Sequence, residues 1–201
     1  TNPTNQSNPN KEKIMHIKHL GYFLLACVAM GCVQTSLPKP KGLLSLNYPD
    51  PSYQSFRNKA PFGFEYNQTA RIKRSARQGH SLVYPDMKAT LYLSYVPVTN
   101  NLDSLLTDAY KLPSKHISKA VEIPERLFVN PDHRVYGTLF KVVGDAASQL
   151  QFFLTDSTDH FMVGSLYFYS RPNYDSLLPA LDYIEKDVIH LMETLEWKAK
   201  K

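Results

Sequence analysis

The residues best suited to chemistry in this 201-residue chain form one polar cluster, Thr155 to His160. It holds two carboxylates, Asp156 and Asp159, and the imidazole of His160, a set that binds a divalent ion when its members converge. Asp, Ser and Thr are also the usual residues of tight turns, because their short polar side chains bond nearby backbone groups. Apolar, strand-like runs flank the cluster, so we interpret it as a hairpin turn and expect no metal ion.

The remaining histidines and serines do not fall into a recognisable catalytic pattern. His116 lies beside Lys115 and Lys119, and His190 precedes Glu193, but neither spacing makes a triad or a metalloprotease motif. The 201 residues contain no P-loop and no dinucleotide fingerprint. We therefore expect a protein that is not an enzyme, with no cofactor and no bound nucleotide.

Four cations lie within seven residues and form a candidate interaction surface. They are Arg71, Lys73, Arg74 and Arg77. Such a run attracts anionic lipid headgroups at about 1 kcal/mol per cation close to the surface, and it is also typical of a solvated loop or a protected strand edge. The whole chain carries a formal net charge of +5, which is too mild to indicate nucleic acid.

The N-terminal region has the pattern of an export signal. Residues 1–14 are polar and predict a disordered extension ahead of Met15, which we interpret as the start of translation. Residues 15–31 have a short basic segment followed by about a dozen apolar residues, which is a signal peptide and too short for a membrane-spanning helix. Small residues precede Cys32 as in a bacterial lipobox, so we predict that Cys32 carries the lipid, with Cys27 as the alternative.

Both cysteines lie in or next to this signal, so the rest of the chain contains none. Residues 32–41 are polar and punctuated by proline, which predicts an extended tether. The remaining residues, 42–201, are expected to form one globular domain without a disulfide. A lipid on Cys32 would hold that domain at a membrane, because acyl chains contribute about 0.8 kcal/mol per buried methylene.

The domain shows more strand patterns than helix patterns. Asn101 is a candidate cap for a helix whose apolar face includes Leu102, Leu105, Leu106 and Ala109, and Pro113 should end or kink that helix. Pro85 indicates an edge strand or a bulge. The expected strands cover residues 43–46, 62–66, 82–85, 89–96, 134–143, 149–154 and 161–169, and the last three are closely spaced, as in an antiparallel meander.

The final helix has the clearest periodicity. Asp175 is a plausible cap, and Pro179 falls in the first turn, where a missing donor costs nothing. Its apolar seam comprises Leu177, Leu181, Ile184, Val188, Leu191 and Leu195. Both alternating sets of the late strands are apolar, so we expect helices or a partner protein to cover both faces of the sheet. The fold class is therefore α+β, an antiparallel sheet of about six or seven strands with two main helices.

Several sequence strings resemble the gliding motility lipoprotein GldD family of the Bacteroidetes. They include Val135-Tyr136-Gly137, Gln151-Phe152-Phe153, Thr155 to Phe161, Gly164 to Phe168, Pro172 to Ser176 and Leu191 to Leu195, and upstream Pro38 to Lys41, Phe62 to Glu65, Lys88 to Tyr95 and the lipobox. Members carry cysteines near positions 60 and 80, where this chain has Ala60 and His80, so any disulfide there is absent. The order of elements also resembles the PsbP-like α/β/α sandwich.

The resemblance implies a role in the envelope machinery of gliding and type IX secretion. On that basis the partners would be other envelope proteins and the membrane, with no nucleic acid. No acidic pair follows Cys32, which favours a domain facing the periplasm, because acidic residues there accompany export to the cell surface in this phylum. A periplasmic module that binds a small apolar ligand or lipid between sheet and helix is the alternative function.

Overall fold

A computed structural model describes residues 48–74, 79–170 and 173–198, all within the expected globular domain. The helices are α2 (Leu102–Ser114), the short 3-10 helix η1 (Ile117–Lys119) and α3 (Tyr174–Glu193). The strands are β1 (Tyr53–Phe56), β2 (Phe62–Asn67), β3 (Arg71–Arg74), β4 (Gly79–Tyr84), β5 (Ala89–Pro97), β6 (Ala120–Glu122), β7 (Glu125–Asn130), β8 (Val135–Lys141), β9 (Val143–Gly144), β10 (Ser148–Thr155), β11 (His160–Phe168) and β12 (Glu196–Trp197).

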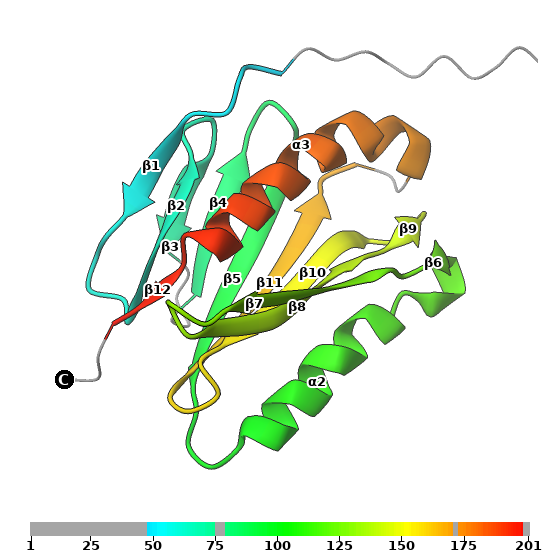
Figure 1. Ribbon diagram of the computed structural model, residues 1–201. Coiled ribbons are helices and arrows are strands. Elements are labelled where there is room, and N and C mark those ends of the chain that lie inside the picture. Colours follow the sequence, from blue (N-terminus) through cyan, green and yellow to red (C-terminus); the bar gives the residue numbers. More distant parts are fainter. Residues whose placement is uncertain (1–47, 75–78, 171–172, 199–201) are drawn as a thin grey trace, which may run out of the picture. The chain divides into compact units, whose positions relative to one another are not determined.

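A seven-stranded antiparallel sheet forms the centre of the domain (Figure 1), in the order β3-β4-β5-β11-β10-β8-β7. Strands β8, β10 and β11 are neighbours, which confirms the expected meander. Two smaller sheets, β1-β2-β12 and β6-β9, complete the described part of the chain. The α+β fold class predicted from the sequence is confirmed.

The two faces of the central sheet are covered by different helices. All eight residues of β10 are buried, and successive side chains of a strand point to opposite faces. Phe152 and Leu154 belong to a core that includes α3 and the β1-β2-β12 sheet, whereas Phe153 belongs to a second core with α2. Burial of each such side chain contributes about 1.5–3 kcal/mol. The prediction that both faces are covered is confirmed for this strand, with helices as the cover.

Helix α3 has the predicted seam, but its first residue and its cap differ from the prediction. The cap is Asn173, whose side chain accepts a hydrogen bond from the backbone of Ser176. Asp175 therefore lies inside the first turn, where its charge suits the helix dipole. The helix ends at Glu193, so the last seam residue, Leu195, is buried beyond it.

Helix α2 begins after Asn101, as predicted, although the Asn101 side chain makes no cap hydrogen bond. Its oxygen accepts from the backbone of Thr99 instead. Pro113 lies in the last turn and the helix ends at Ser114, so the prediction that this proline ends the helix is confirmed. The residues that follow include η1.

Two strand predictions need correction, and one lies outside the described residues. Strand β4 is an inner strand between β3 and β5, so Pro85 marks neither an edge nor a bulge but the turn that follows β4. The predicted strand over 134–143 is divided, since β8 ends at Lys141 and β9 begins at Val143. The candidate strand over 43–46 is not among the described residues.

Candidate functional site

Three cations of the basic run, Arg71, Lys73 and Arg74, lie in the edge strand β3. Their side chains point to two different faces of the sheet. Arg71 and Lys73 share one face of the sheet, while Arg74 points to the opposite face. Lys73 pairs with Ser81 and Arg74 with His80 on the neighbouring strand β4. Arg77 lies outside the described residues. The structure therefore places the described members of the run in two sites rather than in one patch.

On the face of the sheet that carries Lys73, α2 covers only one half. The register places Lys73, Ser81, Tyr92 and Ser165 in one row across β3, β4, β5 and β11. Helix α2 packs instead against residues of β8, β10 and β11, and Figure 1 shows it beneath that part of the sheet. Tyr92 and Tyr169 are 43% and 62% exposed. An aromatic and cationic surface therefore faces solvent here.

We name this surface the tyrosine face; its residues are Arg71, Lys73, Tyr92, Tyr167 and Tyr169. The hydroxyl oxygens of Tyr92 and Tyr169 lie 2.6 Å apart, within hydrogen-bond distance. The Tyr92 and Tyr167 rings meet edge to face with their centres 5.8 Å apart. These contacts favour one arrangement of the rings, which lowers the entropy cost of ordering them when a partner binds.

The hydroxyl groups of Tyr92 and Tyr169 affect each other's pKa. The nearby Thr90 hydroxyl, the hydrogen bond to Tyr92 and the charge of Lys73 lower the pKa of Tyr169. The same bond to Tyr169 raises the pKa of Tyr92. The register places Lys73 in the same row as Tyr92, so the cation and the ring lie on the same face of the sheet.

Arg74 lines a cavity of about 460 Å³ on the other side of the sheet. Its lining residues come from the loop before β2 and from β2, β3, β4 and β5; they are Asn58, Lys59, Ala60, Pro61, Phe62, Arg74, His80 and Tyr95. Ala60 and His80 therefore line the same cavity. Its volume lies in the range of small-molecule sites, and Phe62 and Pro61 give it an apolar wall.

The buried ring of His80 has a defined tautomer in this cavity. The backbone of Ala60 donates to Asn58 Oδ1 at 2.7 Å, which turns Asn58 Nδ2 toward His80 Nε2 at 3.4 Å. His80 Nε2 therefore accepts, and the neutral ring carries its proton on Nδ1, which is buried without a partner among the described residues. Burial, with the positive charge of Arg74 adding to it, lowers the pKa of His80.

The Thr155–His160 cluster is a hairpin turn, as predicted. Asp156 Oδ1 accepts hydrogen bonds from the backbone of Thr158, Asp159 and His160 at 2.8–3.0 Å. The ring of His160 stacks on Trp197 and its Nδ1 lies 2.8 Å from the Tyr95 hydroxyl. Among the described residues, no group of three or more His, Cys, Asp or Glu side chains is placed to hold a metal ion.

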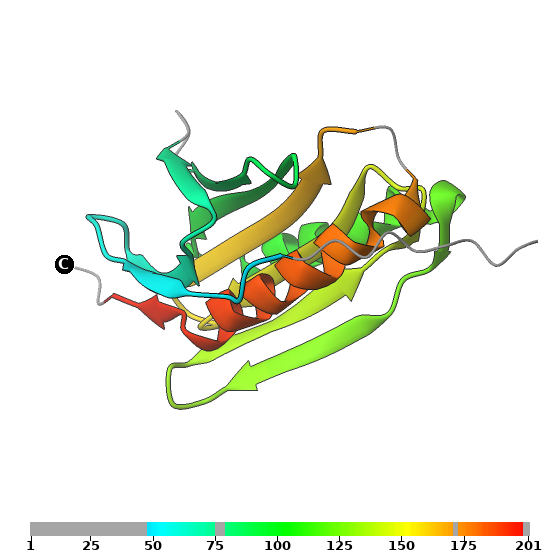
Figure 2. The same ribbon diagram turned by 90° about the horizontal axis from the view of Figure 1, so that it is seen from above.

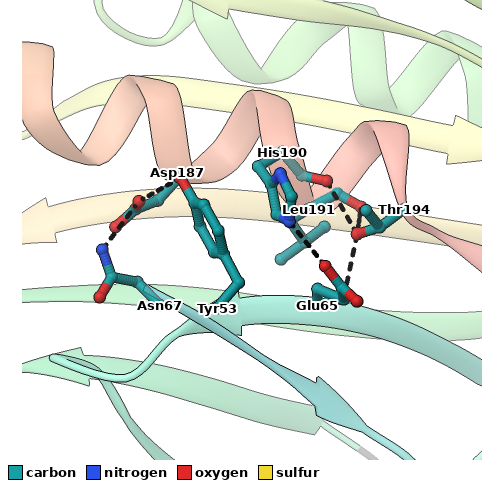
Figure 3. Close-up of polar contacts among 7 residues, drawn as sticks. All are labelled: Tyr53, Glu65, Asn67, Asp187, His190, Leu191 and Thr194. Carbon is teal, nitrogen blue, oxygen red and sulfur yellow. Dashed lines mark hydrogen bonds and ion pairs between the residues drawn. The ribbon is translucent and has the colours of Figure 1, made fainter. Parts of the chain in front are cut away.

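A polar network joins α3 to the small sheet (Figure 3). Tyr53 of β1 and Asn67 of β2 both donate to Oδ1 of Asp187, which is 3% exposed. Burial raises the pKa of Asp187, although the hydrogen bonds from Asn67, Tyr53 and Tyr84 oppose that rise. Burial, with the Asp187 carboxylate adding to it, raises the pKa of Tyr53 to about 12.

A second set of contacts in Figure 3 fixes the end of α3 on β2. His190 Nε2 lies 2.9 Å from the Glu65 carboxylate, and the Glu65 backbone donates to Thr194 Oγ1 at 3.0 Å. The Tyr53 ring stacks on His190 with ring centres 3.6 Å apart. His190 is therefore a packed side chain, and these bonds attach the small sheet to α3.

Sequence reasoning missed the tyrosine face and Asp187, although signals for both exist. Asp187 lies three residues after Ile184 and four before Leu191, so helical spacing alone places it on the buried seam. Tyr92 and Ser94 alternate with buried leucines in β5, which is typical of a strand with one open face. The alternation of polar and apolar residues does not show which strands lie next to one another in the sheet.

Cys32 and Cys27, the two candidate lipid sites, lie outside the described residues. In the part of the chain that the structure describes, no helix is both long enough and apolar enough to span a bilayer.

Comparison with known proteins identifies a family. The model of the family described as gliding motility lipoprotein GldD matches residues 33–197. A comparison with curated proteins finds no match. The matched range covers nearly all of the described residues, including the tyrosine face and the α3 network.

Proposed function

Because the chain belongs to the gliding motility lipoprotein GldD family, we propose that it is a non-enzymatic assembly or stabilising factor of the gliding apparatus and of type IX secretion. It works by contact with other envelope proteins while a lipid holds it at a membrane. Its domain faces the periplasm.

The anchor is Cys32 in this proposal. The lipidated cysteine becomes the first residue of the mature chain, and residues 33–41 separate it from the domain. Several acyl chains hold a protein on a bilayer almost permanently. The domain therefore searches for partners over a surface rather than through a volume, which raises its effective concentration.

The tyrosine face is the observation that supports a function by contact. Tyrosine and arginine are enriched at protein interfaces, where rigid rings supply contact area at little entropic cost. Tyr92, Tyr167 and Tyr169 are held against one another, and Arg71 and Lys73 lie along one side of them. We infer that an envelope protein with an acidic surface docks here.

Substitution of Tyr92 and Tyr169 tests this proposal in the native organism. The chromosomal Tyr92→Ala/Tyr169→Ala variant is expected to reduce both colony spreading and secretion at least tenfold, with normal protein level. The Tyr92→Phe/Tyr169→Phe variant keeps the rings and should retain most of both activities. Normal spreading and secretion by the alanine variant, at normal abundance, would contradict the proposal.

A second candidate function is a periplasmic module that binds a small apolar ligand or lipid. The cavity bounded by Phe62, Arg74 and His80 is the observation that favours it, although this cavity lies beside β2 to β5 and not between sheet and helix. Native mass spectrometry of the full chain separates the two functions. A retained small molecule, lost in Phe62→Asp, favours the ligand, whereas co-purified envelope proteins favour the assembly factor.

A further inference from the structure

Strand β7 leaves one edge of the central sheet open. It pairs with β8 from Glu125 opposite Phe140 to Asn130 opposite Val135. Among the described residues no strand pairs with its other side, and Figure 2 shows β7 as the outermost strand of the sheet. An edge strand of this kind presents backbone N–H and C=O groups that another strand can use.

The two edges of the sheet differ in their protection against pairing with another strand. Strand β3, at the opposite edge, carries three cations in four residues, and charge of this kind discourages edge pairing. Strand β7 instead exposes Leu127 by 73% and Val129 by 58%. Its only charges are Glu125 and Arg126 at its first two positions. One edge is thus protected, and the other is apolar and open.

The sequence of β7 is complementary to itself in one antiparallel register. Directly opposed residues in an antiparallel pair must both point their backbone groups toward the partner or both away. A strand pairing with its own copy therefore aligns residues whose numbers differ by an even count. With the two-fold axis at Phe128, Leu127 faces Val129 of the second copy, and Arg126 faces Asn130.

The next allowed register, with the two-fold axis at Leu127, is less favourable. With the axis at Leu127, Val129 would face the carboxylate of Glu125, and Phe128 would face Arg126. The register centred on Phe128 opposes apolar to apolar on both faces and brings no like charges together. An interface between two identical copies requires such self-complementarity.

We propose that two copies of this chain associate through antiparallel pairing of β7 with β7 about a two-fold axis at Phe128. Six residues a side make a smaller contact than the roughly 800 Å² per partner of a standard interface. The association is therefore weak in free solution. Attachment of both copies to one membrane raises their effective concentration and favours the dimer. This inference uses the lipoprotein family and not the tyrosine face, so either can fail without the other.

Disulfide trapping of the full-length lipoprotein in its native membrane tests the register. Opposed residues of an antiparallel pair lie about 4.5–5.5 Å apart, within the range of a disulfide. The Leu127→Cys/Val129→Cys variant should therefore form a dimer on oxidation, at least tenfold more than either single variant. The matched control is Arg71→Cys/Lys73→Cys, two residues apart on the other edge, which should remain monomeric.

Lysine substitution tests the association without cysteines. Leu127→Lys/Val129→Lys should lower the dimer fraction in chemical cross-linking at least tenfold, while the exposed control Ile117→Lys/Val121→Lys keeps it. Circular dichroism should show both variants folded. A monomeric Leu127→Cys/Val129→Cys protein after oxidation, or a dimer that survives the lysines, overturns the proposal. So does a trapped product with the mass of a different protein, which would assign this edge to a foreign strand.

Discussion

The pKa values of two buried aspartates are shifted in opposite directions, and the surroundings of each side chain explain why. Burial disfavours the charge of Asp156, but hydrogen bonds from Asp159, His160 and Thr158 outweigh it and lower the pKa. Burial dominates at Asp187, so the pKa of that carboxyl is raised. The first aspartate stabilises a turn as an anion, whereas the second is a buried group whose ionisation is costly.

Removal of the Asp156 carboxylate should destabilise the β10–β11 hairpin. Asp156→Ala leaves three backbone donors without their acceptor, so we expect the free energy of unfolding to fall by about 2–3 kcal/mol at pH 7. Because the folded pKa lies below 3.8, this contribution is complete above pH 3.8 and is lost as the pH falls further. Urea unfolding at pH 7 and at pH 3 measures both effects. Asp132→Ala, in the exposed turn between β7 and β8, is the control; an equal loss in both variants would contradict this account.

Asp187 should give a pH dependence of the opposite sign. Its folded pKa is raised above 3.8, so ionisation lowers the stability of the folded state as the pH rises from 3.8 through the folded value. Asp187→Asn removes this ionisation and keeps an oxygen for Tyr53 and Asn67. We expect the variant to gain stability relative to the native chain between pH 3 and pH 7 in urea unfolding. The same comparison with the exposed Asp182→Asn should show no such gain.

At the scale of elements, strand packing depends on a close approach between β8 and β10. A Cβ atom on Gly137 would collide with the backbone carbonyl of Phe153, and backbone cannot move aside as a side chain can. The glycine therefore permits the two strands to pair at their observed separation. This requirement is invisible in the apolar pattern of β8.

Gly137→Ala is accordingly expected to destabilise the domain by about 3 kcal/mol or more. Gly63→Ala is the matched control, since its Cβ atom would lie 3.3 Å from the Phe56 carbonyl oxygen and needs only a small shift. Thermal unfolding followed by circular dichroism compares the two. Similar melting temperatures for both variants would show that β8 and β10 can separate more easily than the geometry indicates.

At the scale of the whole molecule, the two faces of the central sheet are covered unevenly. Two cores lie on opposite faces of one sheet, and α3 with the small sheet covers one face while α2 covers part of the other. The uncovered half carries the tyrosine face, and β7 forms the edge that lacks the cations of β3. We propose a contact for each of these two surfaces.

Attachment itself can be tested by metabolic labelling with a fatty acid. Cys32→Ala should abolish incorporation of the label into this protein, whereas Cys27→Ala should leave it unchanged. Blotting of the membrane fraction serves as the check that each variant is made. Label that survives in Cys32→Ala would move the attachment point to Cys27.

Much of the architecture follows from local patterns in the sequence. The 3.6-residue seam of α3, the turn chemistry around Asp156 and the closely spaced strands of the meander all depend on near neighbours along the chain. Strands β1, β3, β6 and β12, which have two to four residues each, and the longer β7 were not assigned from the sequence. Each of them pairs with a partner strand that local patterns do not identify.

The amino-acid sequence alone predicted an export signal and a candidate lipid site, and it was sufficient for the α+β class and the family resemblance. Only the tertiary structure decided that Arg74 lies away from Arg71 and Lys73, that Tyr92 meets Tyr169, and that Asp187 is buried under β1 and β2. Alternation along a strand says which residues share a face. Which strand lies next to it, and which face a helix covers, depends on contacts between residues far apart in the chain.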